Sequence, residues 1–585
     1  MRHGHYIFMP KTTIKSISEA YYGWVWDGMV IVVGCVSPET AEERINYLNS
    51  LNLRLSASSC ATLPPLAVLD DPAIIATEKS PNWVRYRLPN LRAQRFYTVK
   101  PLQLDLIPKS EKLDPTQNVT LLDAAITTDP TRPQVSGGLN VPSMDIILDH
   151  VNIASVVNQL MQGNITTSSL ISSEGTQPKH KPATHNSSAW DALNVAILAP
   201  LRLLGIACNA PLPVLYSGST LIKDMSATLQ QIDVRLEQTL NAGEQYRATK
   251  PRNVQDIARS TSRYINFFNC VWLIANDVII GTAFGGFICE NNDALADLGS
   301  WFIHYYFIEL LRESLHWLDN WPIGLKLNTE LSGFLCASFS TSIDYWEYTF
   351  KMVTPYFPLA LYCIGSTGIL GTTMVLSLIS DVLGILTFHT YICYLLATTV
   401  FSRLLKLIGS LFNLFRGKRR NILRNRTDTW NYDMDQLMLG TILFTLVTFL
   451  FPTVTVYYML FTLTRLGIIG IQATLETILA FLNHFPLFAL MLRVKDPARL
   501  PGGIELRLEI CGKSPAIPPS TRLELVNKPI PYSQIFFQHL TVWSKLSSHY
   551  NPLRLLKCAL TGALITPISR YSIRFELPSP DRPAN

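Results

Sequence analysis

Long apolar runs fill the middle of this chain and are nearly absent from its two ends. About 20 predominantly apolar residues are needed for a helix to cross the hydrocarbon core of a bilayer. The stretches that reach this length are Tyr264–Ile288, Leu298–Leu318, Thr354–Ser402, Leu437–Phe461 and Leu466–Leu492. The pattern predicts a polytopic α-helical membrane protein of four to six spans, with water-exposed flanks.

In the two flanks, apolar and polar residues alternate over the short distances that are typical of strands and helices in soluble domains. Residues 21–52 predict a strand and then a helix, because β-branched and aromatic residues fill "WVWDGMVIVVGCV" and Ser37 can cap the helix. Leucines alternate with polar residues from Leu102 to Leu106, as in a half-buried strand. After Leu500, "IELRLEI" and "RLELV" predict a hairpin, and "YSQIFFQHLTVWSKL" predicts a short amphipathic helix.

These patterns divide the chain into five predicted regions. We expect a cytosolic α/β region, a polar linker, a segment of interfacial and polar helices, a transmembrane helical domain and a small cytosolic α+β tail. In chain order their bounds are 1–164, 165–189, 190–263, 264–492 and 493–585. The linker is assigned from its polar composition without a hydrophobic period.

Lysine and arginine placement predicts the orientation of the membrane domain. Residues 403–426 carry eight basic side chains, so this loop is expected in the cytosol. Six crossings with a tight turn at Asp381 satisfy this orientation, and so do four if Leu298–Leu318 lies in the interface and 354–402 crosses once. Four are favoured, because each charge on a span costs roughly 2.5–3.5 kcal/mol at the helix centre. The N-terminus lacks the apolar core of a signal peptide, so both flanks are expected in the cytosol.

Composition supports the membrane assignment and narrows the chemistry. Only 16% of the residues are charged and the mean hydropathy is +0.19, whereas soluble domains carry about 25% charged residues. The net charge of +6 comes from basic residues clustered where topology requires them, so nucleic-acid binding is not indicated. The ten cysteines form no CxxC pair, so neither a disulfide framework nor a zinc site is expected.

Asp433 and Asp435 have the Asp-x-Asp spacing with which many nucleotide-sugar transferases hold a divalent metal. The pair also directly precedes a predicted span that starts near Leu437, where carboxylates cap a helix and favour its positive N-terminal dipole. No glycine-rich phosphate loop accompanies the pair. We therefore interpret it as structural and predict no metal, cofactor or catalytic residue, with metal chemistry as the open alternative.

Four polar residues lie at or near membrane depth, namely Asn276, Asp277, Asp381 and His389. Such residues usually face the interior of a bundle, so we expect interface packing here and not catalysis. Asn276 is the expected hydrogen-bond partner of Asp277, and Asp381 suits a helix end or a turn. The basic run 416–426 predicts a solvated loop, with anionic lipid headgroups or an acidic partner surface as alternatives.

Longer blocks of the membrane region carry a family resemblance. The blocks are "YINFFNCVWLIANDVIIG" (264–281), "GLKLNTEL" (324–331), "LSLISDVLGILTFHTYICY" (376–394) and "LFRGKRRNILRNRTDTWNYDMDQLMLGTILFTLVTFLFPTVTVYYMLF" (414–461). Together they resemble the PIG-Q family, in that family's order across 264–492. The first 190 residues match poorly, and the resemblance says little about them.

The resemblance implies an accessory subunit of the complex that transfers N-acetylglucosamine from UDP-N-acetylglucosamine to phosphatidylinositol, at the cytosolic face of the endoplasmic reticulum. It implies that a separate glycosyltransferase subunit is catalytic and that other membrane subunits are partners. On this interpretation Arg424, Arg426, Asp428, Asp433 and Asp435 dock another subunit or line the lipid's approach. Two alternatives stay open: an integral-membrane glycosyltransferase acting alone through the two aspartates, and a lipid transporter.

Overall fold

The computed structural model describes residues 6–11, 19–50, 63–69, 82–90, 93–102, 104, 144–162, 211–213, 219–221, 226–249, 257–320, 324, 327–421, 426–508 and 522–565. The chain forms two compact units. The sheet unit comprises residues 1–198, 238–272 and 486–537, and the helical unit comprises 199–237, 273–485 and 538–585. The predicted linker 165–189, the apolar stretch 190–207, Leu106 and Arg424 lie outside the described residues.

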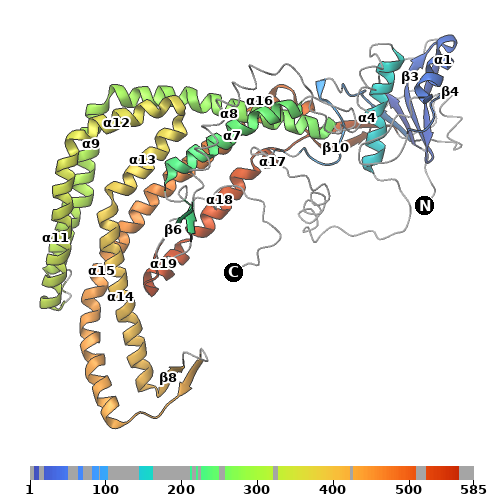
Figure 1. Ribbon diagram of the computed structural model, residues 1–585. Coiled ribbons are helices and arrows are strands. Elements are labelled where there is room, and N and C mark those ends of the chain that lie inside the picture. Colours follow the sequence, from blue (N-terminus) through green and yellow to red (C-terminus); the bar gives the residue numbers. More distant parts are fainter. Residues whose placement is uncertain are drawn as a thin grey trace. The chain divides into compact units, whose positions relative to one another are not determined.

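A seven-stranded sheet is the centre of the sheet unit (Figure 1). Its strand order is β10-β11-β5-β1-β3-β2-β4. The bounds are β1 Tyr6–Pro10, β2 Ala20–Trp26, β3 Met29–Val36, β4 Ala67–Leu69, β5 Asn82–Tyr86, β10 Pro501–Leu508 and β11 Arg522–Pro529. β1 pairs in parallel with β3 and β5, and β11 pairs in parallel with β5. The predicted C-terminal hairpin is confirmed as β10 and β11, and it joins the N-terminal strands in one sheet.

The sheet is buried on both faces, which explains the unbroken apolar run in β3. On one face Ile31 belongs to a cluster with Val151 of helix α4 (Met144–Met161), while Val30 belongs to a cluster on the other face. Within 21–52 one strand was predicted, but the structure has two, β2 and β3, which pair antiparallel on either side of Asp27 and Gly28. The predicted helix is confirmed as α1 (Pro38–Ser50), which begins at Pro38 as the capping signals indicated.

Long helices with short breaks make up most of the chain from residue 227 onward. They are α7 (Ala227–Thr249), α8 (Ile257–Glu290), α9 (Asn292–His304), the π-helical turn η4 (Tyr305–Glu309), α10 (Leu310–Asp319), α11 (Thr329–Val353), α12 (Phe357–Ser366), the 3₁₀ turn η7 (Thr367–Leu370), α13 (Thr372–Leu386), α14 (Phe388–Phe415), α15 (Met434–His484), α16 (Leu487–Lys495), α17 (Tyr532–Ile535), α18 (Phe537–His549) and α19 (Pro552–Thr561). α14 and α15 run side by side as a long hairpin (Figure 1).

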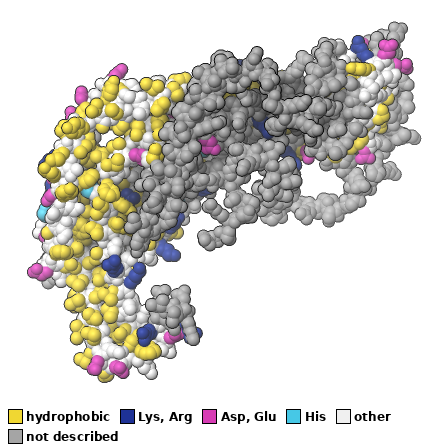
Figure 2. Space-filling view, viewed as in Figure 1, with side chains coloured by type: hydrophobic (Ala, Val, Ile, Leu, Met, Phe, Trp, Pro, Cys, Tyr) yellow, Lys and Arg dark blue, Asp and Glu magenta, His cyan; other side chains and the backbone are white. Residues whose placement is uncertain are grey.

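Within the residues that the structure describes, four helical segments are long and apolar enough to cross a membrane: Ser260–Glu290, Thr329–Leu370, Phe388–Phe415 and Met434–His484. Hydrophobic side chains cover much of the outward face of the helical unit in the view of Figure 2. Such a surface suits contact with lipid tails, because water would not solvate it favourably. A mostly helical protein with several candidate spans and an N-terminal sheet is therefore confirmed.

Two boundary predictions are wrong in detail. The break expected between Phe461 and Leu466 is absent, because α15 is continuous over 51 residues, which is about 76 Å of helix. Arg465, which lies between the two predicted spans, is buried with its guanidinium 4.8 Å from the ring centroid of Tyr391. The expected turn at Asp381 is also absent, since Asp381 lies inside α13.

Small residues let α8 approach the segment around η7 very closely. A Cβ atom on Gly285 would lie 2.2 Å from the carbonyl oxygen of Gly365, and one on Gly281 would lie 2.5 Å from that of Gly368. This is the small-xxx-small packing by which membrane helices bring their backbones together. The contact fixes the register of Asp277, one helical turn before Gly281.

Candidate functional site

Asp277 is the centre of a buried polar network in the helical unit. Its side chain is 4% exposed. Oδ2 accepts from Arg235 of α7 and from the Thr373 hydroxyl at 2.8 Å, while Oδ1 accepts from the Thr373 backbone N–H at 3.0 Å. Arg235 also donates to the Thr373 hydroxyl at 3.0 Å. The carboxylate is therefore paired with a cation and with the first turn of α13, where the helix dipole favours negative charge.

Gly371 is required at this junction. Its φ of +124° lies in a region that favours glycine, and it precedes the first residue of α13. A Cβ atom there would lie 2.0 Å from Asp277 Oδ2. The backbone therefore approaches the carboxylate as closely as only glycine permits.

Asp381 binds the N-terminus of α7. Its carboxylate accepts from the backbone N–H of Ala227 at 2.8 Å and of Thr228 at 2.9 Å. It also accepts from the hydroxyls of Ser226 at 2.5 Å and Thr228 at 2.7 Å. A side chain from α13 thus satisfies the free N–H groups at the start of another helix, which is the role of an N-cap residue. The prediction that Asp381 sits at a helix end is wrong for its own helix.

One face of α7 carries all these contacts. Between the capped end and Arg235 lies Gln231, whose amide donates to Thr373 and to Asn483 of α15, both at 2.9 Å. Asn483 donates back to Gln231 at 2.8 Å. Residues 228, 231 and 235 are spaced three and four apart, so they share one helix face. The sequence predicted a polar helix here but not its contacts with α8, α13 and α15. The signal that could have revealed them is the Asp277 carboxylate at membrane depth, because such a group requires a cation from another part of the chain.

Asn276 is not the partner of Asp277. It is partly buried on the same helix, and the hydrogen bonds of the Asp277 carboxylate go to Arg235 and Thr373. Consecutive residues on a helix point in directions about 100° apart, so their side chains do not face one another. The expectation of a bond between them is wrong.

His389 packs in the core of a second helix cluster. It is 3% exposed, its Nε2 lies 3.1 Å from the carbonyl oxygen of Phe307, and its ring stacks on Trp346 with centroids 5.0 Å apart. Since a carbonyl can only accept, Nε2 carries the proton. Phe307 lies in the π-helical turn η4, where the ladder of backbone bonds is irregular. His389 therefore satisfies an acceptor in that turn.

The basic run forms a small hairpin at the far end of the α14–α15 pair (Figure 1). Strand β8 (Lys418–Asn421) pairs antiparallel with β9 (Arg426–Thr429). Arg426 Nε forms an ion pair with Asp428 at 2.8 Å, and the Arg419 guanidinium lies 4.9 Å from the ring centroid of Trp430. The hairpin presents a cationic surface in which some charges are already paired.

Asp433 and Asp435 lie at the start of α15, as predicted. Asp433 is at the N-cap position but makes no side-chain capping bond, and Asp435 is in the first turn. Both are exposed. In the part of the chain that the structure describes, no group of three or more His, Cys, Asp or Glu side chains is placed to hold a metal ion. The pair can favour the helix dipole, and its exposed carboxylates can contact a partner.

A family model matches the part of the chain that carries most of the buried network. The family model Gpi1, described as an N-acetylglucosaminyl transferase component, matches residues 229–502. A Saccharomyces cerevisiae protein named phosphatidylinositol N-acetylglucosaminyltransferase subunit GPI1 is 30% identical over 531 residues, covering 86% of this chain and 85% of the yeast protein.

For two other relatives, the match extends over a smaller share of the relative's length. A Schizosaccharomyces pombe protein, N-acetylglucosaminyl-phosphatidylinositol biosynthetic protein gpi1, is 36% identical over 66% of this chain and 60% of that protein. The Homo sapiens phosphatidylinositol N-acetylglucosaminyltransferase subunit Q is 39% identical over 33% of this chain and 25% of that protein. No solved structure matches the chain.

Proposed function

This chain belongs to the Gpi1 family, and from that premise we propose that it is a noncatalytic, complex-stabilising subunit of an N-acetylglucosaminyltransferase complex of the endoplasmic reticulum membrane. The complex transfers N-acetylglucosamine from UDP-N-acetylglucosamine to phosphatidylinositol, the first step of glycosylphosphatidylinositol-anchor biosynthesis. Relatives named as subunits of this transferase support the proposal. Its expected partners are a catalytic glycosyltransferase subunit and other membrane subunits.

The observation that carries a stabilising role is the use made of the buried polar groups. Asp277, Asp381 and His389 all lie within the matched region, and each bonds to groups of another helix. Groups that are already bonded and buried hold helices together and are poorly placed to meet a sugar nucleotide. They give a rigid mount on which another subunit can act.

Activity of the chain with and without its partners tests the proposal. The tagged full chain is purified from membranes under mild and harsh detergent conditions, and transfer of radiolabelled N-acetylglucosamine to phosphatidylinositol is measured. We expect activity only where a glycosyltransferase chain co-purifies. Transfer by this chain alone in phosphatidylinositol liposomes would refute the noncatalytic role.

A self-sufficient glycosyltransferase is the second candidate, favoured only by the exposed pair Asp433 and Asp435. On that hypothesis Asp433→Asn with Asp435→Asn abolishes metal-dependent activity while the complex still assembles. On our proposal the same double variant retains activity whenever its partners remain bound. The assay needs the intact complex, with partner content measured in the same sample.

The sheet also constrains the membrane topology. Leu523 of β11 lies opposite Val84 of β5 in parallel register, and Lys11 forms an ion pair with Glu524 at 2.5 Å. Strands of one open sheet share one aqueous compartment, because exposed sheet edges are not tolerated in the hydrocarbon core. This supports an even number of crossings between β5 and β10, which four spans satisfy. We infer that this compartment is the cytosol, where the sequence predicts both flanks.

The continuity of α15 has a consequence for the basic hairpin. A helix that crosses once has its two ends on opposite sides, so the β8–β9 hairpin and the sheet unit then face different compartments. The cytosolic flanks and the cytosolic 403–426 loop expected from sequence are therefore incompatible with one crossing by α15. We infer that the sheet unit is cytosolic and that the hairpin faces the lumen.

The sequence Asn425-Arg426-Thr427 supplies a built-in test of this topology. The triplet is an acceptor for N-glycosylation, which occurs only on the lumenal side. We expect a glycan-dependent mobility shift that Asn425→Gln abolishes, and cytosolic access for a cysteine placed after Leu508. An unglycosylated Asn425, together with cytosolic labelling of cysteines placed both in the hairpin and after Leu508, would exclude a single crossing by α15.

We further propose that the hairpin and the start of α15 contact another subunit or lipid headgroups. The residues concerned are Arg424, Arg426, Asp428, Asp433 and Asp435. Asn276, which is partly buried and does not bond to the Asp277 carboxylate, is a further candidate contact. Exposed charges of both signs at the end of a long helical pair are suited to a polar interface. Charge-reversed variants should lower partner recovery without unfolding the helical unit.

A further inference from the structure

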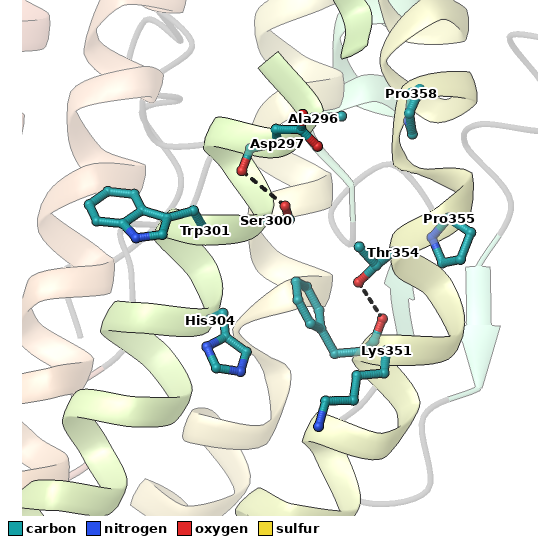
Figure 3. A pocket seen from close by; sticks show the side chains of 10 residues that line it. Ala296, Asp297, Ser300, Trp301, His304, Lys351, Thr354, Pro355 and Pro358 are labelled. Atoms are coloured by element: carbon teal, nitrogen blue, oxygen red, sulfur yellow. Dashed lines mark hydrogen bonds between the residues drawn. The ribbon is translucent and has the colours of Figure 1, made fainter. Parts of the chain in front are cut away.

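Lys351, which lines the groove between α9 and the α11–α12 segment, is already ion-paired (Figure 3). Its Nζ lies 2.8 Å from Glu347, and Arg312 pairs with both Glu347 and Asp344. The basic groups at this groove are therefore balanced within the chain. Helix α19 differs, because it exposes both leucines and basic side chains, and the proposed function gives it no role.

The sequence defines α19 at both ends. Asn551 is the N-cap, whose side chain accepts a hydrogen bond from the Leu553 N–H at 3.0 Å, and Pro552 is the first helical residue. Gly562, with a φ of +65°, ends the helix in the left-handed conformation that favours glycine. The residues between these signals therefore form a helix whose faces are fixed.

One face of α19 packs against the α14–α15 pair (Figure 1). The Ala559 carbonyl accepts from the Tyr458 hydroxyl of α15 at 2.9 Å. A Cβ atom on Gly562 would lie 2.9 Å from the Phe401 ring of α14, so the end of the helix approaches α14 very closely. These contacts attach α19 to two of the candidate spans.

The face of α19 that points away from these helices is a stripe of exposed leucines. Leu553, Leu556 and Leu560 are 75%, 55% and 63% exposed. They are spaced three and four residues apart, which places them on one face of the helix. Water solvates such a stripe unfavourably, so the stripe suits an apolar environment.

The contact with Tyr458 fixes the depth of α19 in the bilayer. The apolar run of α15 begins near Leu437, and about 32 Å of helix separates Leu437 from Tyr458. The hydrocarbon core of a bilayer is about 30 Å thick. With the single crossing of α15 and the lumenal β8–β9 hairpin proposed above, Tyr458 is at the cytosolic border of this core. α19 is therefore held where acyl chains meet headgroups.

Basic side chains border the leucine stripe. Arg554 and Lys557 are exposed on α19, and Arg403 is exposed on α14, two residues beyond Phe401. The segment Tyr532–Thr561, which contains α17, α18 and α19, has no Asp or Glu. Basic residues beside a stripe of leucines are typical of helices in a membrane interface, where lipid phosphates attract the cations. A phospholipid leaflet therefore complements both the apolar and the charged parts of this surface.

We propose that α19 is an interfacial membrane anchor, which inserts its leucine stripe among the acyl chains of the cytosolic leaflet around the α14–α15 pair. Arg554 and Lys557 extend to the phosphate layer, because long basic side chains can keep their stems in an apolar layer and their charges in water. The depth of the anchor rests on the crossing of α15 proposed above. The anchor attaches to the leaflet a part of the chain that the sequence assigns to a cytosolic tail.

Quenching of a fluorescent probe on the stripe tests the anchor. A fluorescent amino acid replaces Leu556 of the full chain by amber suppression, and the protein is placed in nanodiscs of phosphatidylcholine and phosphatidylglycerol. The two quenchers are brominated acyl chains and aqueous iodide. We expect lipid quenching at Leu556 to match that of a probe at Leu439, an exposed position of α15, and to exceed several-fold that at Leu508, an exposed position of β10.

Charged variants test whether the leucines cause this contact. With the probe at Leu560, Leu553→Asp combined with Leu556→Asp should abolish most of the lipid quenching and increase quenching by iodide. Leu508→Asp changes an exposed leucine of β10 and should alter neither. The thermal unfolding midpoint of each variant shows whether the helical unit remains folded.

Two results at Leu556 would overturn the proposal. Iodide quenching equal to that at Leu508 would place α19 in water, and protection from both quenchers would show that protein covers the stripe. Partner recovery and transferase activity, measured in parallel, report on the subunit function. The glycan at Asn425 reports on the compartment, so a failure of either earlier proposal is distinguishable from a failure of the anchor.

Discussion

Two acidic regions of the molecule have similar sequence contexts and very different surroundings. Asp277 is an aspartate within an apolar helix, and Asp433 is one at the edge of another. Asp277 is buried and fully bonded to a cation, a hydroxyl and a backbone N–H, whereas Asp433 is exposed and makes no capping bond. The comparison teaches that the buried acid holds the helices in place and the exposed one remains available to partners.

The largest test of this difference removes the buried charge. Asp277→Asn removes the negative charge that pairs with Arg235, and breaking a buried ion pair by removing one partner costs about 3–5 kcal/mol. We expect a large drop in the thermal unfolding midpoint of the detergent-purified chain. Asp293→Asn, at an exposed position of α9, is the control and should change little. Equal unfolding midpoints for the two variants would contradict a stabilising role for the buried network.

A second test disturbs the contact between α8 and the start of α13 without removing a charged group. Gly371→Ala puts a Cβ atom into the space of the Asp277 carboxylate and strains the backbone at φ +124°, for a cost of about 2–4 kcal/mol. Gly286→Ala is the matched control, because a Cβ there meets nothing within 4 Å. The same unfolding assay should separate the two, and a neutral Gly371→Ala would show that the two segments are not in contact.

Loss of the cap on α7 should have a smaller effect. Asp381→Ala leaves the N–H groups of Ala227 and Thr228 without their acceptor, and removal of a cap costs about 0.5–2 kcal/mol. Asp381→Asn keeps an acceptor oxygen and should recover part of the loss. Hydrogen exchange of the first turn of α7 measures this directly. Unchanged exchange in Asp381→Ala would contradict the capping role.

The exposed pair should show the smallest effect on stability. Asp433→Ala with Asp435→Ala removes surface carboxylates near a helix N-terminus, which are worth about 0.3–1 kcal/mol each at most. We expect a nearly unchanged unfolding midpoint and a reduced yield of partner subunits on affinity purification. A shift as large as that of Asp277→Asn would abolish the distinction between the two regions.

Sequence reasoning found the elements and missed the long-range pairings. The β10–β11 hairpin, the start of α1 at Pro38 and the candidate span Ser260–Glu290 follow from local periods and capping signals, whereas the candidate span Thr329–Leu370 was not predicted. The pairing of Arg235 with Asp277 could not be located, because the two residues are 42 positions apart on different helices and local periodicity carries no information about such contacts. The continuity of α15 was missed because Leu437–Phe461 and Leu466–Leu492 were each long enough for a separate crossing, whereas Arg465 between them is buried against Tyr391.

The placement of β11 beside β5 has a consequence for biosynthesis. β5 ends at Tyr86 and β11 begins at Arg522, so that edge of the nascent sheet stays unpaired until the ribosome has made every membrane helix. Unpaired strand edges are prone to aggregate. A nascent chain truncated before residue 522 would therefore depend on chaperones to shield that edge, and quality control would have a simple way to recognise a polypeptide whose membrane segments are incomplete.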